Sequence, residues 1–264
     1  MLHSARARKI KRKLMSCKVD FVIVGTQKGG TTALDACLRE HPGVRMANQK
    51  EVHFFDNEKH FPPDGNVDYN IYHEYFSPSP SGVLLGEATP IYMYWTESPK
   101  RIHAYNPAIK IIVMLRNPIY RAFSHWNMER DRGADSLSFW EAITTETQRC
   151  QQAHPYQHRV FSYIDRGFYS RQLERLWSYF PKEQTLILRQ EEFKETPLPV
   201  FNKVCDFLGV ERFVELHKRD VHSRPYSTSM SPREWDYLND IFGSEITRLE
   251  ALLGWDCSSW RRRT

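Results

Sequence analysis

Five consecutive residues of a glycine-rich segment carry groups suited to binding an anion: Lys28, Gly29, Gly30, Thr31 and Thr32. The two glycines allow the backbone to curl so that its N–H groups face a phosphate. The start of a following helix adds partial positive charge, the lysine adds a full charge, and the threonines add hydroxyls. The segment therefore predicts a P-loop-like phosphate cradle. The alternative is a plain strand–turn–helix in which the glycines serve geometry alone.

The cradle differs from a Walker A loop. In that pattern the lysine follows the last glycine, whereas Lys28 precedes both glycines. The apolar run Lys110–Leu115 also ends in Arg116 rather than in an acid that could serve Mg²⁺. The sequence thus predicts a nucleotide ligand without Mg-ATP chemistry.

A second candidate anion site combines Arg116, at the end of that apolar run, with Ser124. A guanidinium can engage phosphate oxygens in a bidentate manner. Ser124 lies two turns into the helix that Asn117 and Pro118 are expected to start, as N-cap and first helical residue. Alone, Arg116 could equally form a buried structural ion pair. Two anion sites in one crevice predict a ligand with phosphate at both ends.

A third motif, residues 49–55, reads Gln-Lys-Glu-Val-His-Phe-Phe and is expected to form a short extended piece. Strand alternation would place Glu51, His53 and Phe55 on one face. A carboxylate beside an imidazole suits proton abstraction from an acceptor. Taken alone, such a pair is more typical of a surface strand.

The surrounding pattern alternates strands with helices. We expect buried strands at residues 19–25, 83–87, 110–115 and 184–188, and helices at 31–40, 69–76, 118–130, 169–180, 199–208 and 232–253. This alternation predicts a single α/β domain with a central parallel sheet flanked by helices. Ligands of such sheets bind beyond the carboxyl ends of the strands, where the first two motifs would meet.

Composition narrows the class of protein. The chain has 264 residues, and no apolar run approaches the ~18 residues that a membrane span needs. Its five cysteines form no CxxC pair, which favours reduced thiols in a cytoplasmic protein and argues against a structural zinc site. We therefore expect a cytoplasmic protein without a transmembrane segment or a metal.

The net charge of +5 comes from the ends of the chain. Ten of the 37 basic residues lie in segments 1–18 and 261–263, which leaves 27 against 32 acidic residues, a balance of −5. A basic tail could touch nucleic acid or an anionic membrane, or be merely solvated. We expect residues 1–18 to form a flexible arm, residues 19–264 to form the catalytic domain, and nucleic acid not to be a partner.

Together the three motifs resemble the sulfotransferase superfamily that uses 3′-phosphoadenosine 5′-phosphosulfate, over about residues 19–256. The likeness is greatest to the branch with the heparan sulfate N-deacetylase/N-sulfotransferases, the 3-O-sulfotransferases and their bacterial relatives. It rests on Lys28-Gly-Gly-Thr-Thr32 for the 5′-phosphosulfate, on Arg116-Asn-Pro through Ser124 for the 3′-phosphate, and on Glu51-Val-His-Phe-Phe-Asp56 for the catalytic segment.

The resemblance implies a role for each matching residue. Lys28 would neutralise the bridging oxygen of the leaving phosphate, and Gly29 to Thr32 would hold the phosphosulfate. Glu51 would be the general base, with His53 orienting the acceptor. The family closes a Lys-Gly-Arg loop over the nucleotide before its last helix, and Arg224 stands at that place here.

The sequence departs from the secreted glycan-modifying members. It shows no membrane anchor and no cysteine between Cys205 and Cys257, where those members have a disulfide, and Ala88 replaces a lysine of the 3-O branch. These departures and the −5 balance weigh against a polyanionic glycan. Within the expected class of small-molecule or carbohydrate acceptors, a small, partly apolar acceptor fits the aromatic residues better. Six aromatic residues could line its pocket or simply pack in the core: Phe54, Phe55, Tyr92, Tyr94, Trp95 and Trp126.

The expected reaction is in-line transfer of the sulfuryl group to an acceptor hydroxyl, or less favourably to an amine. Glu51 would take the proton, the product would be 3′-phosphoadenosine 5′-phosphate, and no metal would be needed. Two alternatives remain at this point: a nucleotide or small-molecule kinase of P-loop ancestry, and a non-enzymatic anion-binding module. The acceptor and the oligomeric state are not encoded in any pattern we can interpret.

Overall fold

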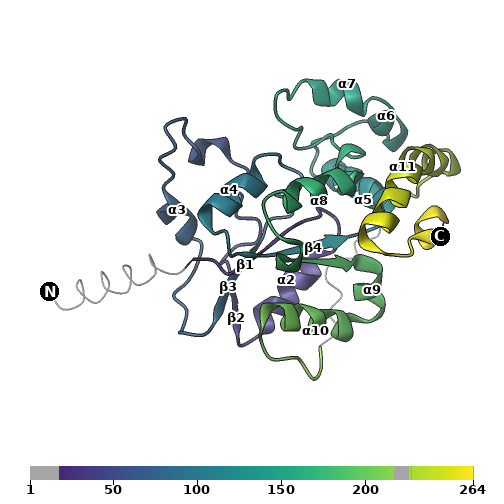
Figure 1. Cartoon of the computed structure of the whole chain (residues 1–264). Helices are drawn as coiled ribbons and strands as arrows, with labels where there is room; N and C mark the ends of the chain where they lie inside the picture. The colour runs from purple at the N-terminus through teal and green to yellow at the C-terminus, as the bar shows by residue number, and fades with distance from the viewer. Residues whose placement is uncertain (1–17, 217–225, 227, 264) are drawn as a thin grey trace. The chain divides into compact units, whose positions relative to one another are not determined.

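A computed structural model describes residues 18–216, 226 and 228–263. Five strands form one parallel sheet in the order β2-β3-β1-β4-β5 (Figure 1). They are β1 (Phe21–Gly25), β2 (Val44–Met46), β3 (Leu84–Ala88), β4 (Lys110–Leu115) and β5 (Thr185–Arg189). The predicted fold class, a single α/β domain with a parallel sheet flanked by helices, is confirmed.

Helices cover the sheet because both of its faces are apolar, as is usual for parallel sheets. Phe21 and Ile23 point into a core formed with α2 (Thr31–Glu40), α9 (Gln190–Glu195) and α10 (Pro197–Leu208). In Figure 1, α3 (Tyr69–His73) and α4 (Ser98–Tyr105) lie on the other side of the sheet from α2 and α10. There a cluster of aromatic rings packs edge to face: Phe54, Phe55, Tyr72, Tyr92 and Tyr105.

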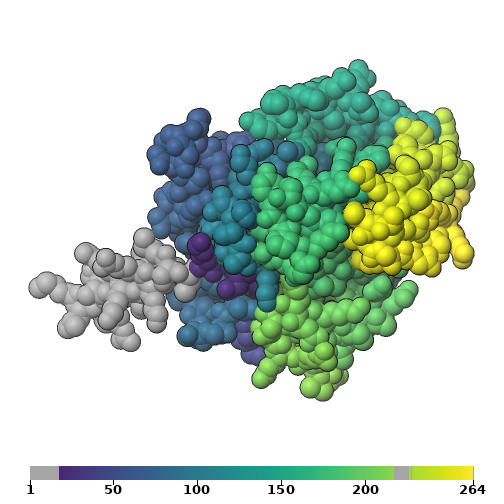
Figure 2. Space-filling model, viewed as in Figure 1, coloured from purple at the N-terminus to yellow at the C-terminus, as the bar shows by residue number. Residues whose placement is uncertain are grey.

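The chain groups into two compact units. The first holds the sheet and comprises described residues 18–26, 30–115 and 179–216, whereas the second comprises 27–29, 116–178, 226 and 228–263. The second unit contains α5 (Pro118–Asp131), α6 (Phe139–Thr144), α7 (Glu146–Gln151), α8 (Tyr169–Trp177) and α11 (Pro232–Leu253). The residues of α11 form much of the yellow surface in Figure 2. Short 3₁₀ turns occur at Glu58–His60, Asp165–Gly167, Lys182–Gln184 and Ser258–Arg261.

The predicted strands and helices match most of the observed elements, and the start of α5 is as expected. The side chain of Asn117 accepts a hydrogen bond from the Ile119 N–H (2.9 Å), and Pro118 opens the helix. The extended piece predicted near Glu51 is wrong, because those residues form an irregular turn. The short elements β2, α4, α6, α7 and α9 were not predicted. In the part of the chain that the structure describes, no helix has the length and hydropathy needed to cross a membrane.

Candidate active site

The glycine-rich loop leaves β1 and enters α2. The N–H and hydroxyl of Thr26 both donate to the Met114 carbonyl, at 2.9 and 3.0 Å, which fixes the start of the loop. Gly30 is the N-cap of α2 with φ 95°, and a Cβ there would lie 3.0 Å from Cγ of Gln190. Both facts require glycine. Gly30 supplies no side-chain cap to the first turn, where the Ala33 N–H donates to the Gly30 carbonyl at 3.1 Å, so the first N–H groups of the helix, at Thr31 and Thr32, are the ones suited to an anion.

Residues 27–29 belong to the second unit, where two arginines hold them. Arg116 donates from Nη1 to the Lys28 carbonyl at 3.3 Å, so the structure brings together these two predicted donor-binding residues. Arg166 is buried and donates to the side-chain oxygen of Gln27 and to Oγ of Ser162, the latter at 2.8 Å. No sequence pattern indicated Arg166, because its partner Gln27 lies 139 residues away.

The surroundings of Lys28 in the second unit carry several positive charges. His125 on α5 is fully buried, and its pKa is held well below the usual value by burial and by the charges of Arg166, Arg121, Lys28 and Arg132. A neutral imidazole among cations marks a region that an anionic ligand would stabilise.

The second predicted anion site includes Ser124 on α5, and the structure shows this serine to be buried. Arg121 is also fully buried, and its guanidinium donates to the Tyr163 carbonyl, so this arginine anchors the helix to the following segment. Arg224 lies outside the described residues.

The segment we term the Glu51 turn (residues 50–56) joins four charged side chains. Lys50 Nζ lies 2.8 Å from Oε1 of Glu51, and His53 Nε2 lies 3.5 Å from Oε2 of the same carboxylate. The other ring nitrogen of His53 is 3.0 Å from Oδ2 of Asp56. Glu51 and His53 thus come together as predicted, but through a turn rather than a strand face. Phe55 is fully buried and shares no face with the 44% exposed His53 side chain.

Hydrogen bonds set the charges in the Glu51 turn. Burial by itself would raise the pKa of Glu51, but hydrogen bonds from His53 and Lys50, with their charges, lower it to about 2. The hydrogen bond to Asp56, followed by that to Glu51, raises the pKa of His53 to about 9. At neutral pH the carboxylate is therefore ionised and the imidazole protonated. Asp56, whose side chain is fully buried, was not singled out from the sequence as a site residue.

Backbone conformation distinguishes three residues from the rest. Among the described non-glycine residues, only Lys28, Glu51 and His53 have positive φ, at 68°, 63° and 54°. The left-handed region is unfavourable for such residues and is concentrated at functional sites. These three are the residues that the sequence pattern predicts to be catalytic.

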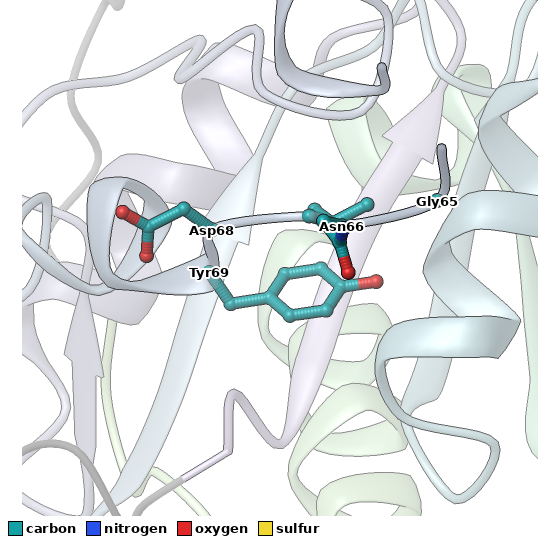
Figure 3. Close-up of a pocket in the computed structure, with 5 residues that line it drawn as sticks. Gly65, Asn66, Asp68 and Tyr69 are labelled. Atoms are coloured by element: carbon teal, nitrogen blue, oxygen red, sulfur yellow. The ribbon is translucent and has the colours of Figure 1, made fainter. Parts of the chain in front are cut away.

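Several other features do not contribute to the site. The six aromatic residues proposed to line an acceptor pocket are all buried at 5% exposure or less, so core packing, the alternative left open, is correct. A cavity of about 520 Å³ lies at residues 65–69, which comprise a loop and the first residue of α3 (Figure 3), and it includes no predicted site residue. The described cysteines form no disulfide, and no three described acidic, histidine or cysteine side chains are grouped as metal ligands.

Comparison with known proteins identifies the family. The sequence model described as "Sulfotransferase domain" matches residues 18–224. The chain belongs to the sulfotransferase family. It is 32% identical over 193 residues to mouse heparan sulfate glucosamine 3-O-sulfotransferase 3B1 (73% of this chain, 46% of the relative). It is 34% identical over 203 residues to human bifunctional heparan sulfate N-deacetylase/N-sulfotransferase 3 (72% and 22%). The chain therefore spans less than half the length of these curated relatives.

Solved structures agree with the fold. The crystal structure of a sulfotransferase from Alicyclobacillus acidocaldarius matches with a TM-score of 0.79 and 31% identity, covering 93% of this chain and all of that one. Mouse sulfotransferase SULT7A1, solved with PAP, matches with a TM-score of 0.54 at 14% identity over 90% of this chain and 89% of its own, which supports the fold alone. The resemblance inferred from the motifs is confirmed, and family membership favours a sulfotransferase over the kinase and the non-enzymatic module.

Proposed function

We propose that this sulfotransferase moves the sulfuryl group of 3′-phosphoadenosine 5′-phosphosulfate to a hydroxyl of a carbohydrate acceptor. The observation that carries the proposal is the left-handed backbone shared by Lys28, Glu51 and His53 and by no other described non-glycine residue. A motif-based prediction of catalytic residues and an independent feature of the backbone select the same three positions.

The donor fits the positive region around the glycine-rich loop. Lys28, Gly29, Gly30, Thr31 and Thr32 would hold the phosphosulfate, with the amino end of α2 contributing its partial charge. Arg116 and Ser124 would hold the 3′-phosphate, and Arg224 would add a further contact. The pKa of the buried His125 supports this assignment, because burial and then the positive charges of Arg166, Arg121 and Lys28 in the same unit lower it.

Glu51 is suited to accept the acceptor proton because its carboxylate stays ionised across the neutral range. A carboxylate with a pKa of about 2 is a weak base, so the acceptor oxygen must gain acidity by beginning to bond to sulfur before its proton moves. The bond from sulfur to the phosphate oxygen breaks as the new bond forms, and Lys28 stabilises the charge that develops on the leaving phosphate. His53, fixed by Asp56, orients Glu51 and the acceptor.

The class of acceptor follows from the relatives. Both names refer to heparan sulfate: one names 3-O-sulfation of its glucosamine, and the other names N-sulfation. A carbohydrate is therefore the first class to test, with hydroxyl and amine acceptors as separate arms. The burial of the aromatic residues removes the main argument for a small apolar acceptor. A cytoplasmic location and a flexible arm at residues 1–18 remain predictions.

Calorimetric titration with 3′-phosphoadenosine 5′-phosphate tests the donor, with ATP plus magnesium as the parallel ligand. We expect saturable binding of the 3′-phosphorylated nucleotide and its weakening by Arg116→Ala. Labelled-sulfate transfer to glucosamine-containing oligosaccharides then tests the reaction. Binding of Mg-ATP without binding of the 3′-phosphorylated nucleotide would overturn the proposal.

A further inference from the structure

The structure contains a buried carboxylate that the proposed reaction does not use. Glu87 in β3 is fully buried. Its Oε1 accepts a hydrogen bond from the Tyr72 hydroxyl (2.8 Å), and its Oε2 accepts one from the Thr89 hydroxyl (2.7 Å). The Tyr92 hydroxyl is a further polar neighbour, and it lowers the pKa of this carboxylate.

Two of these three hydroxyls connect Glu87 to the Glu51 turn. The Thr89 hydroxyl accepts a hydrogen bond from the Val52 N–H at 2.9 Å. The Tyr92 hydroxyl accepts one from the Phe54 N–H at 3.0 Å. Val52 and Phe54 are the residues on either side of His53, so the two hydroxyls hold the backbone at the two left-handed residues.

The polarity of these contacts is determined by the carboxylate. An ionised carboxylate only accepts hydrogen bonds, so the Thr89 hydroxyl must donate to it and keeps its lone pairs for the Val52 N–H, and the charge favours the same orientation of the neighbouring Tyr92 hydroxyl. A neutral residue of the same shape cannot impose that direction on all three hydroxyls. The arrangement is thus a relay from one buried charge to two backbone donors.

We propose that Glu87 is a positioning residue for sulfuryl transfer, which holds Glu51 and His53 in their left-handed conformations through the hydroxyls of Thr89 and Tyr92. The inference rests on the proposed function, because it assigns a task to a residue that contacts neither donor nor acceptor. Glu87 would thus support the Glu51 turn from within the sheet-containing unit.

The relay predicts a dependence on pH that Glu51 cannot supply. Burial raises the pKa of Glu87 to about 7 against the hydrogen bonds that it receives, and the titratable groups facing it are Asp56, Tyr72, Tyr92 and Tyr105. Burial keeps the three tyrosines protonated far above neutral pH. Below pH 7 the protonated carboxyl must itself donate to one hydroxyl, which disrupts the relay. We expect kcat to fall on this acid side.

Two tyrosine substitutions test the relay, and Tyr72→Phe is the control for Tyr92→Phe. Tyr92→Phe removes a hydroxyl that holds the turn at Phe54, whereas Tyr72→Phe removes one that, among the residues that the structure describes, hydrogen-bonds to Glu87 and not to the turn. We expect Tyr92→Phe and Thr89→Val to lower kcat by about tenfold or more, and Tyr72→Phe to stay within about twofold at pH 8, because small displacements of reacting groups are costly. Nucleotide affinity should be unchanged in all three.

The pH profile separates positioning from a general loss of structure. Glu87→Gln should lower kcat and abolish the acid limb near pH 7. Glu245→Gln is the matched control, since Glu245 is another buried glutamate that accepts bonds from the hydroxyl and N–H of Ser170, in the second unit. We expect that control to keep both kcat and the limb. Equal kcat losses in Tyr72→Phe and Tyr92→Phe, or a limb that persists in a folded Glu87→Gln, would overturn the proposal.

Amide hydrogen exchange at Val52 and Phe54 provides a test without turnover, and it remains informative if Glu87→Gln does not fold. Exchange should accelerate at Val52 in Thr89→Val and at Phe54 in Tyr92→Phe, with neither amide altered in Tyr72→Phe. These changes in a protein that transfers no sulfuryl group would retain the relay and refute the proposed function. Unaltered exchange in both relay variants would refute the relay whatever the activity.

Discussion

The Glu51 turn and the loop around Lys28 differ in the charges that surround them. In the turn, Lys50, Glu51, His53 and Asp56 alternate in sign and satisfy one another at 2.8 to 3.5 Å. Around Lys28, the positive charges of Arg166, Arg121 and Arg132 add to burial in keeping His125 neutral. The charged groups of the turn are already paired with one another, whereas we expect the loop region to bind an anion. Binding energy for the donor should therefore come mainly from the loop region, and proton transfer should depend on the turn.

Glu51→Gln should give the largest effect and separate the two regions most clearly. The amide cannot accept the acceptor proton, so we expect kcat to fall by roughly 10²–10⁴, the usual contribution of general-base catalysis. Nucleotide affinity by calorimetry should be unchanged, because Glu51 belongs to the charge-balanced turn. Glu58→Gln is a suitable control, since Glu58 lies in the 3₁₀ turn that follows the Glu51 turn and pairs with Arg101 instead. Near wild-type turnover of Glu51→Gln with every acceptor would exclude Glu51 as the base.

Lys28→Ala tests the other side of the comparison. A hydrogen bond to a charged group contributes about 1.5–3 kcal/mol, which corresponds to roughly a ten- to hundredfold loss of nucleotide affinity. Turnover should fall as well, since the same charge stabilises the leaving phosphate. Removing one cation should also make the affinity less sensitive to salt. Unchanged steady-state kinetics and an unchanged salt dependence would refute the assignment of Lys28.

The sequence predicted the Lys28 loop better than the Glu51 turn. An anion-binding loop is indicated by its glycines, its lysine and the helix that follows. The start of α5 is indicated by Asn117 and Pro118. The left-handed conformations of Glu51 and His53 have no such signal, because neither residue is a glycine. Alternation suggested a strand. The N–H groups of Val52 and Phe54 instead donate to the hydroxyls of Thr89 and Tyr92, which lie 37 and 38 positions later and hold a turn.

Residues that support the site were also missed, for a related reason. Arg166 and Asp56 act on Gln27 and His53 through contacts that only the folded chain creates. Short elements such as β2, of three residues, owe their existence to pairing with β3 rather than to their own pattern. Periodicity thus predicted the long, apolar elements, while the irregular segments that carry chemistry depended on tertiary contacts.

The smallest expected effect is on the free energy of unfolding, to which the charge of His53 in the Glu51 turn contributes. His53 has a folded-state pKa raised to about 9, so its protonated form stabilises the fold fully below about pH 6.5, and this stabilisation is lost as the pH rises through 9. Because the side chain is 44% exposed, the contribution should be that of a screened pair, about 0.2–1 kcal/mol.

Denaturant titrations of wild type and His53→Gln between pH 6 and 10 measure this contribution. The unfolding free energy of the wild type should decline more steeply over that range than that of the variant. His73→Gln is the control. Burial lowers the pKa of His73, so His73 changes the pH dependence of the unfolding free energy only below about pH 6.5. Parallel curves for wild type and His53→Gln would mean that His53 is not held as a cation between Glu51 and Asp56. The turn would then carry net negative charge, and the contrast with the Lys28 region would be one of opposite charges rather than of balance against excess.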